Sequence, residues 1–227
     1  MTIPPVTLKP APAAGVWRLG LTHDPIKYNQ VEPETFDGSS AGRFSLFSYG
    51  MLYCTSTPAG CYAEALAIFR IEPMIRELMG NAGTANPDLM AMADIASSWR
   101  EERILVRLIP SPHAQFLDVD TEQTRSWLDR DLKDALSAFG VDGPLTDKHI
   151  HGKDRRIARQ IAAWAVAQRN AAGHQLIQGI TYRSSYSGQR CWAILRDTEL
   201  KEEERRPIRV EDVALQEVAR EYGLTVR

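Results

Sequence analysis

Met51-Leu52-Tyr53-Cys54-Thr55 is followed, after Pro58, by Cys61-Tyr62-Ala63-Glu64-Ala65-Leu66-Ala67-Ile68-Phe69. The first run is short and apolar, which predicts a strand. Pro58 suits the first turn of a helix, and the second run is apolar on every side apart from Glu64, which predicts a buried helix. The pair therefore predicts a strand that leads directly into a helix.

Glu64 stands alone as a charged residue in this predicted helix. A lone buried carboxylate costs several kcal/mol unless a cation or strong hydrogen-bond donors meet it. Arg18 and Arg43 lie upstream and are candidate partners. Two interpretations stay open, a structural arginine–glutamate pair and a carboxylate that is kept for chemistry.

The remaining pattern predicts an α+β fold, with a mixed sheet core and flanking helices. Strands are expected at 16–21, 103–109, 115–119, 176–182 and 191–195, and helices at about 121–139, 154–172 and 211–222. Residues 1–15 contain four prolines and predict an extended tail. Residues 16–227 are expected to form one domain, with a helical insertion at about 70–101.

Composition narrows the class of protein. The chain has 227 residues and a net charge of -2, so its charge gives no reason to expect nucleic acid or acidic membranes as partners. Three cysteines without a CxxC pattern favour reduced thiols in a cytoplasmic protein. Neither a signal peptide nor a transmembrane segment is expected.

Several common kinds of site find little support. His149-Ile150-His151 has no third ligand at a recognisable spacing, so these histidines are interpreted as exposed loop residues and no metal site is expected. Cys61 lies near a helix start, where the thiol pKa can fall, but no histidine has a matching position. The phosphate-binding patterns GxxxxGK[ST] and GxGxxG are both absent from the sequence.

A set of residues remains that one cleft could hold. Arg43, Tyr53 and Glu64 fall on a loop, a strand and the following helix, and the polar loop 183–190 with Ser184 could add donors. Arginines, a tyrosine, a carboxylate and a serine loop suit a ligand with phosphates, a flat ring and sugar hydroxyls. Each residue alone also fits a plain structural role: a solvated arginine, a core tyrosine or a turn serine.

At these residues the sequence resembles the RES-domain family. The similar segments are Val16-Trp17-Arg18-Leu19, Gly42-Arg43-Phe44, Leu52-Tyr53-Cys54-Thr55 with Glu64, and Gly179-Ile180-Thr181-Tyr182-Arg183-Ser184. The resemblance implies a fold similar to that of ADP-ribosyltransferases and cleavage of the nicotinamide–ribose bond of NAD+, by phosphorolysis or hydrolysis. It further implies the toxin of a toxin–antitoxin pair, neutralised by an antitoxin that covers the active site. NAD+ would be the substrate, inorganic phosphate a possible co-substrate, and no further cofactor is expected.

The resemblance also suggests roles for the residues. Glu64 would hold a ribose hydroxyl and stabilise positive charge on the sugar. Arg18 and Arg43 would clamp phosphate oxygens, and Tyr53 would lie against the nicotinamide ring. Ser184 would bind ribose or orient Glu64.

Two other functions remain open for the same cleft. These are transfer of ADP-ribose to a macromolecule and nucleotide binding without catalysis. The apolar segment 84–99 could serve either as a partner surface, including one for a homo-oligomer, or as an ordinary core helix.

Overall fold

A computed structural model describes residues 4–31, 42–47, 49–70, 74 and 94–227. Ten strands lie in these ranges: β1 Leu8–Pro10, β2 Val16–Leu21, β3 Met51–Thr55, β4 Asp94–Ile95, β5 Arg103–Pro110, β6 Gln115–Asp118, β7 Gly179–Arg183, β8 Arg190–Leu195, β9 Leu200–Pro207 and β10 Thr225–Val226. The helices are α1 Pro58–Leu66, η2 Ala67–Phe69, α4 Ser97–Glu101, α5 Glu122–Asp131, α6 Lys133–Ala138, α7 Asp147–His151, α8 Arg155–Ala167 and α9 Val213–Tyr222.

Eight of the strands form one mixed sheet in the order β1-β6-β7-β8-β3-β2-β5-β9. The β6–β7 pair is parallel and the other pairs are antiparallel. Strands β4 and β10 form a separate parallel pair. The predicted α+β class, a mixed sheet core with flanking helices, is confirmed.

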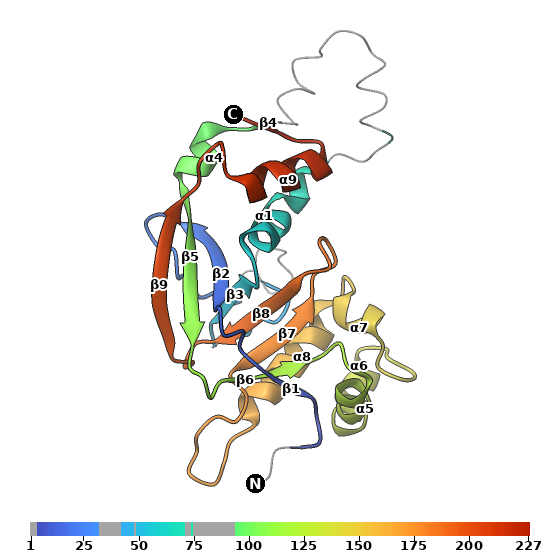
Figure 1. Ribbon diagram of the computed structural model, residues 1–227. Coiled ribbons are helices and arrows are strands. Elements are labelled where there is room, and N and C mark those ends of the chain that lie inside the picture. Colours follow the sequence, from blue (N-terminus) through green and yellow to red (C-terminus); the bar gives the residue numbers. More distant parts are fainter. Residues whose placement is uncertain (1–3, 32–41, 48, 71–73, 75–93) are drawn as a thin grey trace.

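The helices cover the sheet in two groups (Figure 1). Helices α1 and α9 pack together against the β2–β5 half, in a core that contains Tyr62, Leu66 and Tyr222. Helices α5 to α8 pack against the β6–β7 half, in a second core that contains Leu128 and Ile161. Because β3 and β8 lie at the centre of the sheet, residues at their ends meet side chains from both groups.

Local sequence explains why α1 begins where it does. Thr57 is the N-cap: its side chain accepts a hydrogen bond from the Gly60 backbone N–H at 3.1 Å, and Pro58 occupies the first helical position. The strand–turn–helix order predicted for 51–69 is therefore confirmed, with α1 ending at Leu66 and the last three residues forming the 3-10 helix η2. At the end of the chain, Gly223 closes α9 with a positive φ of 72°.

Several predicted boundaries are wrong. The helix expected over 121–139 is two helices, α5 and α6, because the backbone leaves helical geometry at Leu132, with φ -107° and ψ 14°. The helix expected over 154–172 ends at Ala167, and Arg169 and Gln175 then form an isolated β-bridge.

The N-terminal segment is more than a tail. Residues 8–10 form β1, which pairs with β6 through Leu8 opposite Leu117. Most of the insertion expected at 70–101 and of the surface expected at 84–99 lies outside the described residues. Its described end carries β4 and α4.

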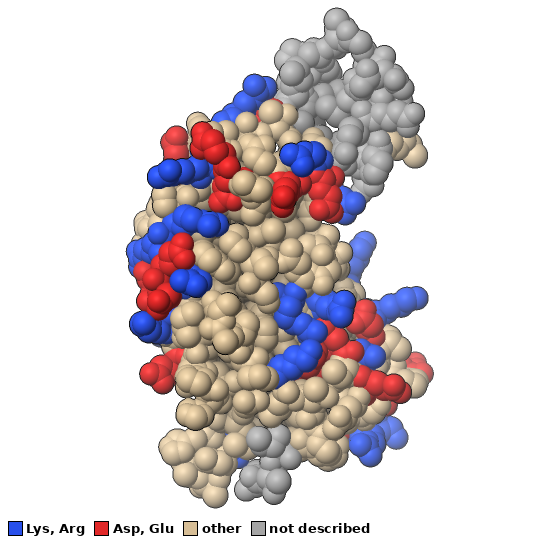
Figure 2. Space-filling model, in the orientation of Figure 1, with Lys and Arg blue, Asp and Glu red and all other residues tan. Residues whose placement is uncertain are grey.

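Strand β9 has no counterpart among the predicted strands. Its sequence, Leu200-Lys-Glu-Glu-Glu-Arg-Arg-Pro207, is almost wholly charged, and it pairs with β5 at the edge of the sheet. Its charges form ion pairs such as Lys201–Glu203 and Arg205–Glu202, and Figure 2 shows acidic and basic side chains intermingled on that side of the molecule. Among the described residues, no helix is both long and apolar enough to cross a membrane.

Candidate functional site

A cavity of about 380 Å³ opens where β2, β3 and α1 meet α7 and the loop after β7. This volume lies within the range of about 300–1,000 Å³ that is typical of small-molecule sites. Its lining residues are Arg18, Leu19, Asn29, Gly42, Arg43, Tyr53, Cys54, Thr55, Cys61, Glu64, Ala65, His151, Arg155, Tyr182, Ser185, Tyr186 and Cys191. Four of the five residues singled out in the sequence therefore face one cavity, and the fifth, Ser184, bonds to one of them.

Glu64 is a half-buried carboxylate on α1 that is fixed through one oxygen. Ser184 Oγ lies 2.5 Å from Glu64 Oε1, and Cys191 Sγ approaches the same oxygen at 3.8 Å. The other oxygen, Oε2, has no hydrogen bond among the described residues, so it is left for a ligand in the cavity. The carboxylate is held by a serine rather than by an arginine, which corrects the ion pair considered from the sequence.

The direction of the Ser184 hydrogen bond follows from its neighbours. Ser184 is buried, and its Oγ accepts hydrogen bonds from the backbone N–H groups of Tyr186 and Ser187 at 3.0 and 3.1 Å. Since a hydroxyl carries one proton and both backbone groups donate to its oxygen, that proton points to Glu64. The loop after β7 thus orients Ser184, and Ser184 orients Glu64.

Arg18 is anchored by backbone carbonyls. Its Nε donates to Pro25 O at 3.0 Å, Nη1 to Tyr53 O at 2.9 Å and Nη2 to Lys27 O at 3.0 Å. A guanidinium has five N–H groups, so, as far as the described part of the chain shows, these bonds leave two donors for a ligand.

Arg43 is anchored in a similar way, at one nitrogen. Its Nη1 donates to Ile150 O at 3.1 Å and to Gly152 O at 2.7 Å, the carbonyls that flank the end of α7. Nη1 is saturated by these two bonds, while Nε and Nη2 make no hydrogen bond to the described residues and remain for a ligand. The cavity therefore contains two pre-oriented positive charges.

Tyr53 offers the cavity its ring rather than its hydroxyl. The hydroxyl accepts from the Phe44 backbone N–H at 2.8 Å and lies 3.0 Å from Ser45 Oγ. Burial raises the pKa of Tyr53 to about 12, so the phenol stays neutral at physiological pH. The ring packs against Gly42 so closely that a Cβ there would lie 2.1 Å from the Tyr53 Cζ.

The cysteines that line the cavity are poor nucleophiles. Cys54, Cys61 and Cys191 are all buried free thiols. Burial raises the pKa of Cys54 to about 12 and that of Cys61 to about 11, and burial also raises the Cys191 pKa. Because the thiolate is the reactive form, the position of Cys61 near a helix start does not activate it.

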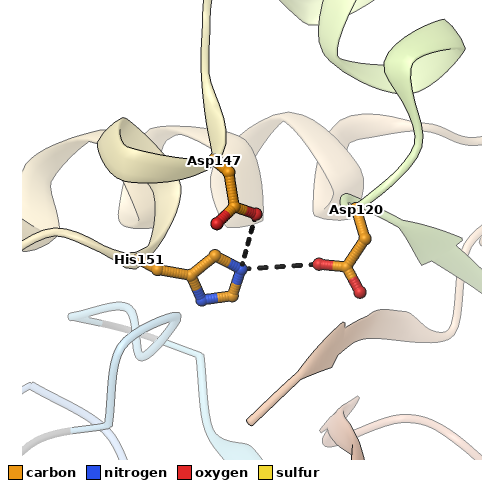
Figure 3. A group of neighbouring side chains, drawn as sticks. All are labelled: Asp120, Asp147 and His151. Carbon is orange, nitrogen blue, oxygen red and sulfur yellow. Dashed lines mark hydrogen bonds and ion pairs between the residues drawn. The ribbon is translucent and has the colours of Figure 1, made fainter. Parts of the chain in front are cut away.

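His151 is the main site residue that the sequence interpretation missed. The histidines at 149 and 151 lie on α7 rather than on an exposed loop, and His151 faces the cavity. Its Nε2 lies 3.4 Å from Asp120 Oδ1 and 3.5 Å from Asp147 Oδ1 (Figure 3). Two features of the sequence could have indicated a short helix here. Thr146 is a residue type that often precedes a helix, and the apolar Ile150 between the histidines needs a buried position, which the structure gives it.

Asp120 ties this group to β8. Arg190 Nη1 lies 3.1 Å from Asp120 Oδ2 and 3.0 Å from Asp118 Oδ1. Burial alone would raise the pKa of Asp120, but the hydrogen bond to His151 and the charge of Arg190 outweigh it and lower the pKa. Asp120, Asp147 and His151 are close enough to hold a metal ion, yet the second oxygen of Asp120 is already taken by Arg190. The expectation of a metal-free site stays a prediction.

Comparison with known proteins gives one match. The family model of the RES domain matches residues 15–216, a range that contains every residue of the cavity discussed above. No curated protein and no solved structure matches the chain. Because the family model covers most of the 227 residues, the chain belongs to the RES-domain family.

Proposed function

We propose that this protein cleaves the nicotinamide–ribose bond of NAD+ and acts as the toxin of a toxin–antitoxin pair. At the family level, RES domains are associated with toxin–antitoxin systems and with enzymes that act on NAD+. The observation that carries the proposal is the Glu64 carboxylate, held by Ser184 through one oxygen and open at the other, in a cavity with two anchored arginines.

Cleavage of this bond does not require a general acid from the protein. The bond between the ribose C1′ and the nicotinamide nitrogen breaks with its electron pair going to nitrogen, and nicotinamide leaves as a neutral molecule. No proton has to be given to the leaving group, so the pair of carboxylates used in ordinary glycoside hydrolysis is not required. A single carboxylate suffices if it stabilises the positive charge that develops on the sugar.

Glu64 has the features this role needs. Its free Oε2 can accept a hydrogen bond from a ribose hydroxyl, and its negative charge stabilises the cationic transition state. Arg18 and Arg43 hold phosphate oxygens through the N–H groups that their backbone contacts leave unused. The Tyr53 ring provides an aromatic face for the positively charged nicotinamide.

An oxygen nucleophile then attacks C1′, and its identity defines the reaction class. Inorganic phosphate gives ADP-ribose 1″-phosphate, and water gives ADP-ribose. A side chain or base of a macromolecule gives an ADP-ribosylated product. Phosphate or water is the acceptor that we propose, and an antitoxin that covers the cavity is the partner. The fold proposed for this chemistry is the ADP-ribosyltransferase type.

The direct test is nicotinamide release from NAD+ by the purified protein, with and without phosphate. Release that rises with phosphate supports phosphorolysis, and release independent of phosphate supports hydrolysis. Adenylate-labelled NAD+ separates these reactions from transfer, because only transfer leaves label on a macromolecule. Tight NAD+ binding without release would instead favour a non-catalytic binding protein.

Glu64→Gln is the matching variant. It keeps the shape of the side chain and an oxygen for Ser184, but it removes the negative charge. We expect a folded protein with at least 100-fold less turnover, since a charged group that stabilises a transition state contributes about 3 kcal/mol or more. Glu122→Gln, at an exposed position of α5, is the control and keeps full turnover. Near-normal NAD+ consumption by folded Glu64→Gln would refute the assignment.

A further inference from the structure

Helix α7 contributes to the cavity in two ways. It brings the His151 side chain to the cavity wall, and its terminal carbonyls, Ile150 O and Gly152 O, hold Arg43 Nη1. Ile150 is fully buried and anchors the helix in the core beneath. The positions of His151 and Arg43 are therefore fixed by the same short element.

The His151 imidazole is held from one side only. Nε2 faces Asp120 Oδ1 and Asp147 Oδ1, while the other ring nitrogen, Nδ1, lies on the opposite side of the ring and faces away from both carboxylates (Figure 3). Because both neighbours of Nε2 are carboxylates, and Asp120 is its hydrogen-bond partner, Nε2 is the donor and carries a proton. Within the described parts of the chain, Nδ1 makes no hydrogen bond, and in the charged imidazole it is a donor as well.

The charged residues that line the cavity indicate which class of ligand this N–H donor would bind. Two arginines that neutral backbone carbonyls hold, Arg18 and Arg43, line the cavity together with one carboxylate, Glu64. This excess of positive charge is complementary to an anion. Phosphate oxygens are acceptors that arginine and charged imidazole N–H groups bind well.

We propose that His151 is a further ligand-contacting residue of this cavity. Its Nδ1–H donates to a phosphate oxygen, while Asp120 and Asp147 hold the ring through Nε2. The proposal rests on the proposed function, under which the phosphate group comes either from the dinucleotide or from free inorganic phosphate. His151, on α7, and Arg43, which the carbonyls of Ile150 and Gly152 hold, then approach the same anion.

Two substitutions separate the two ring nitrogens. His151→Gln places an amide nitrogen near the position of Nε2, so it keeps the contact with the carboxylates and loses the donor at Nδ1. His151→Asn places its amide nitrogen near Nδ1 and keeps a donor towards the ligand. His149→Asn is the matched control, since His149 lies on the same helix and outside the cavity lining, with its Nδ1 bonded to the Thr146 backbone N–H.

The measurement is calorimetric titration of the full-length variants with ADP-ribose and, separately, with inorganic phosphate, so that no turnover is needed. We expect His151→Gln to bind at least one of these ligands about ten-fold more weakly, since a hydrogen bond to a charged group contributes at least about that factor. His151→Asn should fall between His151→Gln and the unaltered protein. His149→Asn should bind within two-fold of the unaltered protein.

The two titrations identify the source of the phosphate. A loss with ADP-ribose alone assigns His151 to the dinucleotide phosphates, and a loss with inorganic phosphate alone assigns it to the free anion. Unchanged affinity of folded His151→Gln for both ligands overturns the proposal and leaves the proposed function standing, as does a His151→Asn variant that binds as weakly as His151→Gln. An unaltered protein that binds neither NAD+ nor ADP-ribose overturns the proposed function, and this proposal with it.

A second measurement does not depend on how the variants fold. In nitrogen-15 spectra of the histidine rings of the unaltered protein, we expect the ligand that the calorimetry identifies to shift the Nδ1 signal of His151. The signals of His149 should stay in place. A His151 Nδ1 signal that stays unchanged with saturating ADP-ribose and with saturating phosphate overturns the proposal.

Discussion

Replacing Ser184 with alanine removes the one short hydrogen bond that fixes the Glu64 carboxylate. The Ser184 hydroxyl donates to Glu64 Oε1 at 2.5 Å, and the remaining contact with that oxygen, from the Cys191 thiol at 3.8 Å, is weak. Without Ser184 the carboxylate can rotate, and Oε2 is no longer aimed at one place in the cavity.

The size of the effect follows from the kind of bond that is lost. A hydrogen bond to a charged group contributes about 1.5–3 kcal/mol, which corresponds to about a 10- to 150-fold decrease in kcat if the whole of it serves orientation. The backbone N–H groups of Tyr186 and Ser187 also lose their acceptor. We therefore expect the free energy of unfolding to fall by about 1–2 kcal/mol.

The assay is nicotinamide release at saturating NAD+, together with urea denaturation of the same preparations. Ser187→Ala is the control, because Ser187 lies in the same loop and its hydroxyl accepts from the Gln189 N–H rather than contacting Glu64. We expect Ser187→Ala to keep its kcat within two-fold. If folded Ser184→Ala also keeps its kcat within two-fold, the argument that Ser184 orients Glu64 is refuted.

Three further outcomes are expected. Gly42→Ala places a Cβ 2.1 Å from the Tyr53 ring, so the ring must move. We expect the free energy of unfolding, measured by urea denaturation, to fall by about 1–3 kcal/mol and NAD+ binding to weaken. An unchanged unfolding midpoint would contradict the close packing. The three buried cysteines have raised pKa values and stay protonated at pH 8, so iodoacetamide should alkylate them slowly until the protein unfolds. Mass spectrometry measures the labelling. Rapid labelling of the native protein would contradict the burial of these thiols. Asp120 has a lowered folded pKa, so its stabilising contribution is present above its unfolded pKa of about 3.9 and is lost as the pH falls through the folded value. The difference in unfolding midpoint between Asp120→Asn and the unaltered protein should accordingly be larger at pH 7 than at pH 3, and a difference that is independent of pH would count against this ion pair.

Much of the fold could be predicted because the central strand and helix are indicated by patterns in their own local sequence. The run 51–55 is apolar and β-forming, and Pro58 with the following apolar residues marks the helix start, so β3 and α1 are evident from local sequence. Strand β9 could not be predicted in the same way. Its stability comes from backbone hydrogen bonds to β5, and its charged side chains give no alternating pattern that would reveal them.

Most residues of the candidate site could be predicted from the sequence, but the hydrogen bonds that hold them could not. Glu64 was identifiable because a lone carboxylate in an apolar helix is unusual; an arginine was one partner considered for it, and Ser184, which the structure places against it, was considered as a group that binds ribose or orients Glu64. The structure instead gives both arginines to backbone carbonyls, such as Tyr53 O and Gly152 O, whose positions depend on how the chain packs. His151 was missed for a related reason. Its ring is held in place by Asp120, which lies 31 residues away in sequence.

The two edges of the eight-stranded sheet have a consequence for how this chain meets others. Strand β1 has only three residues and ends in a proline, which has no backbone N–H to offer, and β9 presents intermingled lysine, arginine and glutamate side chains. Such edges are poor templates for a strand of another molecule, so the native protein is protected from edge-to-edge aggregation when it is made in large amounts. The antitoxin that we propose as a partner, or a second copy of the chain, is accordingly expected to recognise side-chain surfaces such as the mouth of the cavity rather than to extend the sheet.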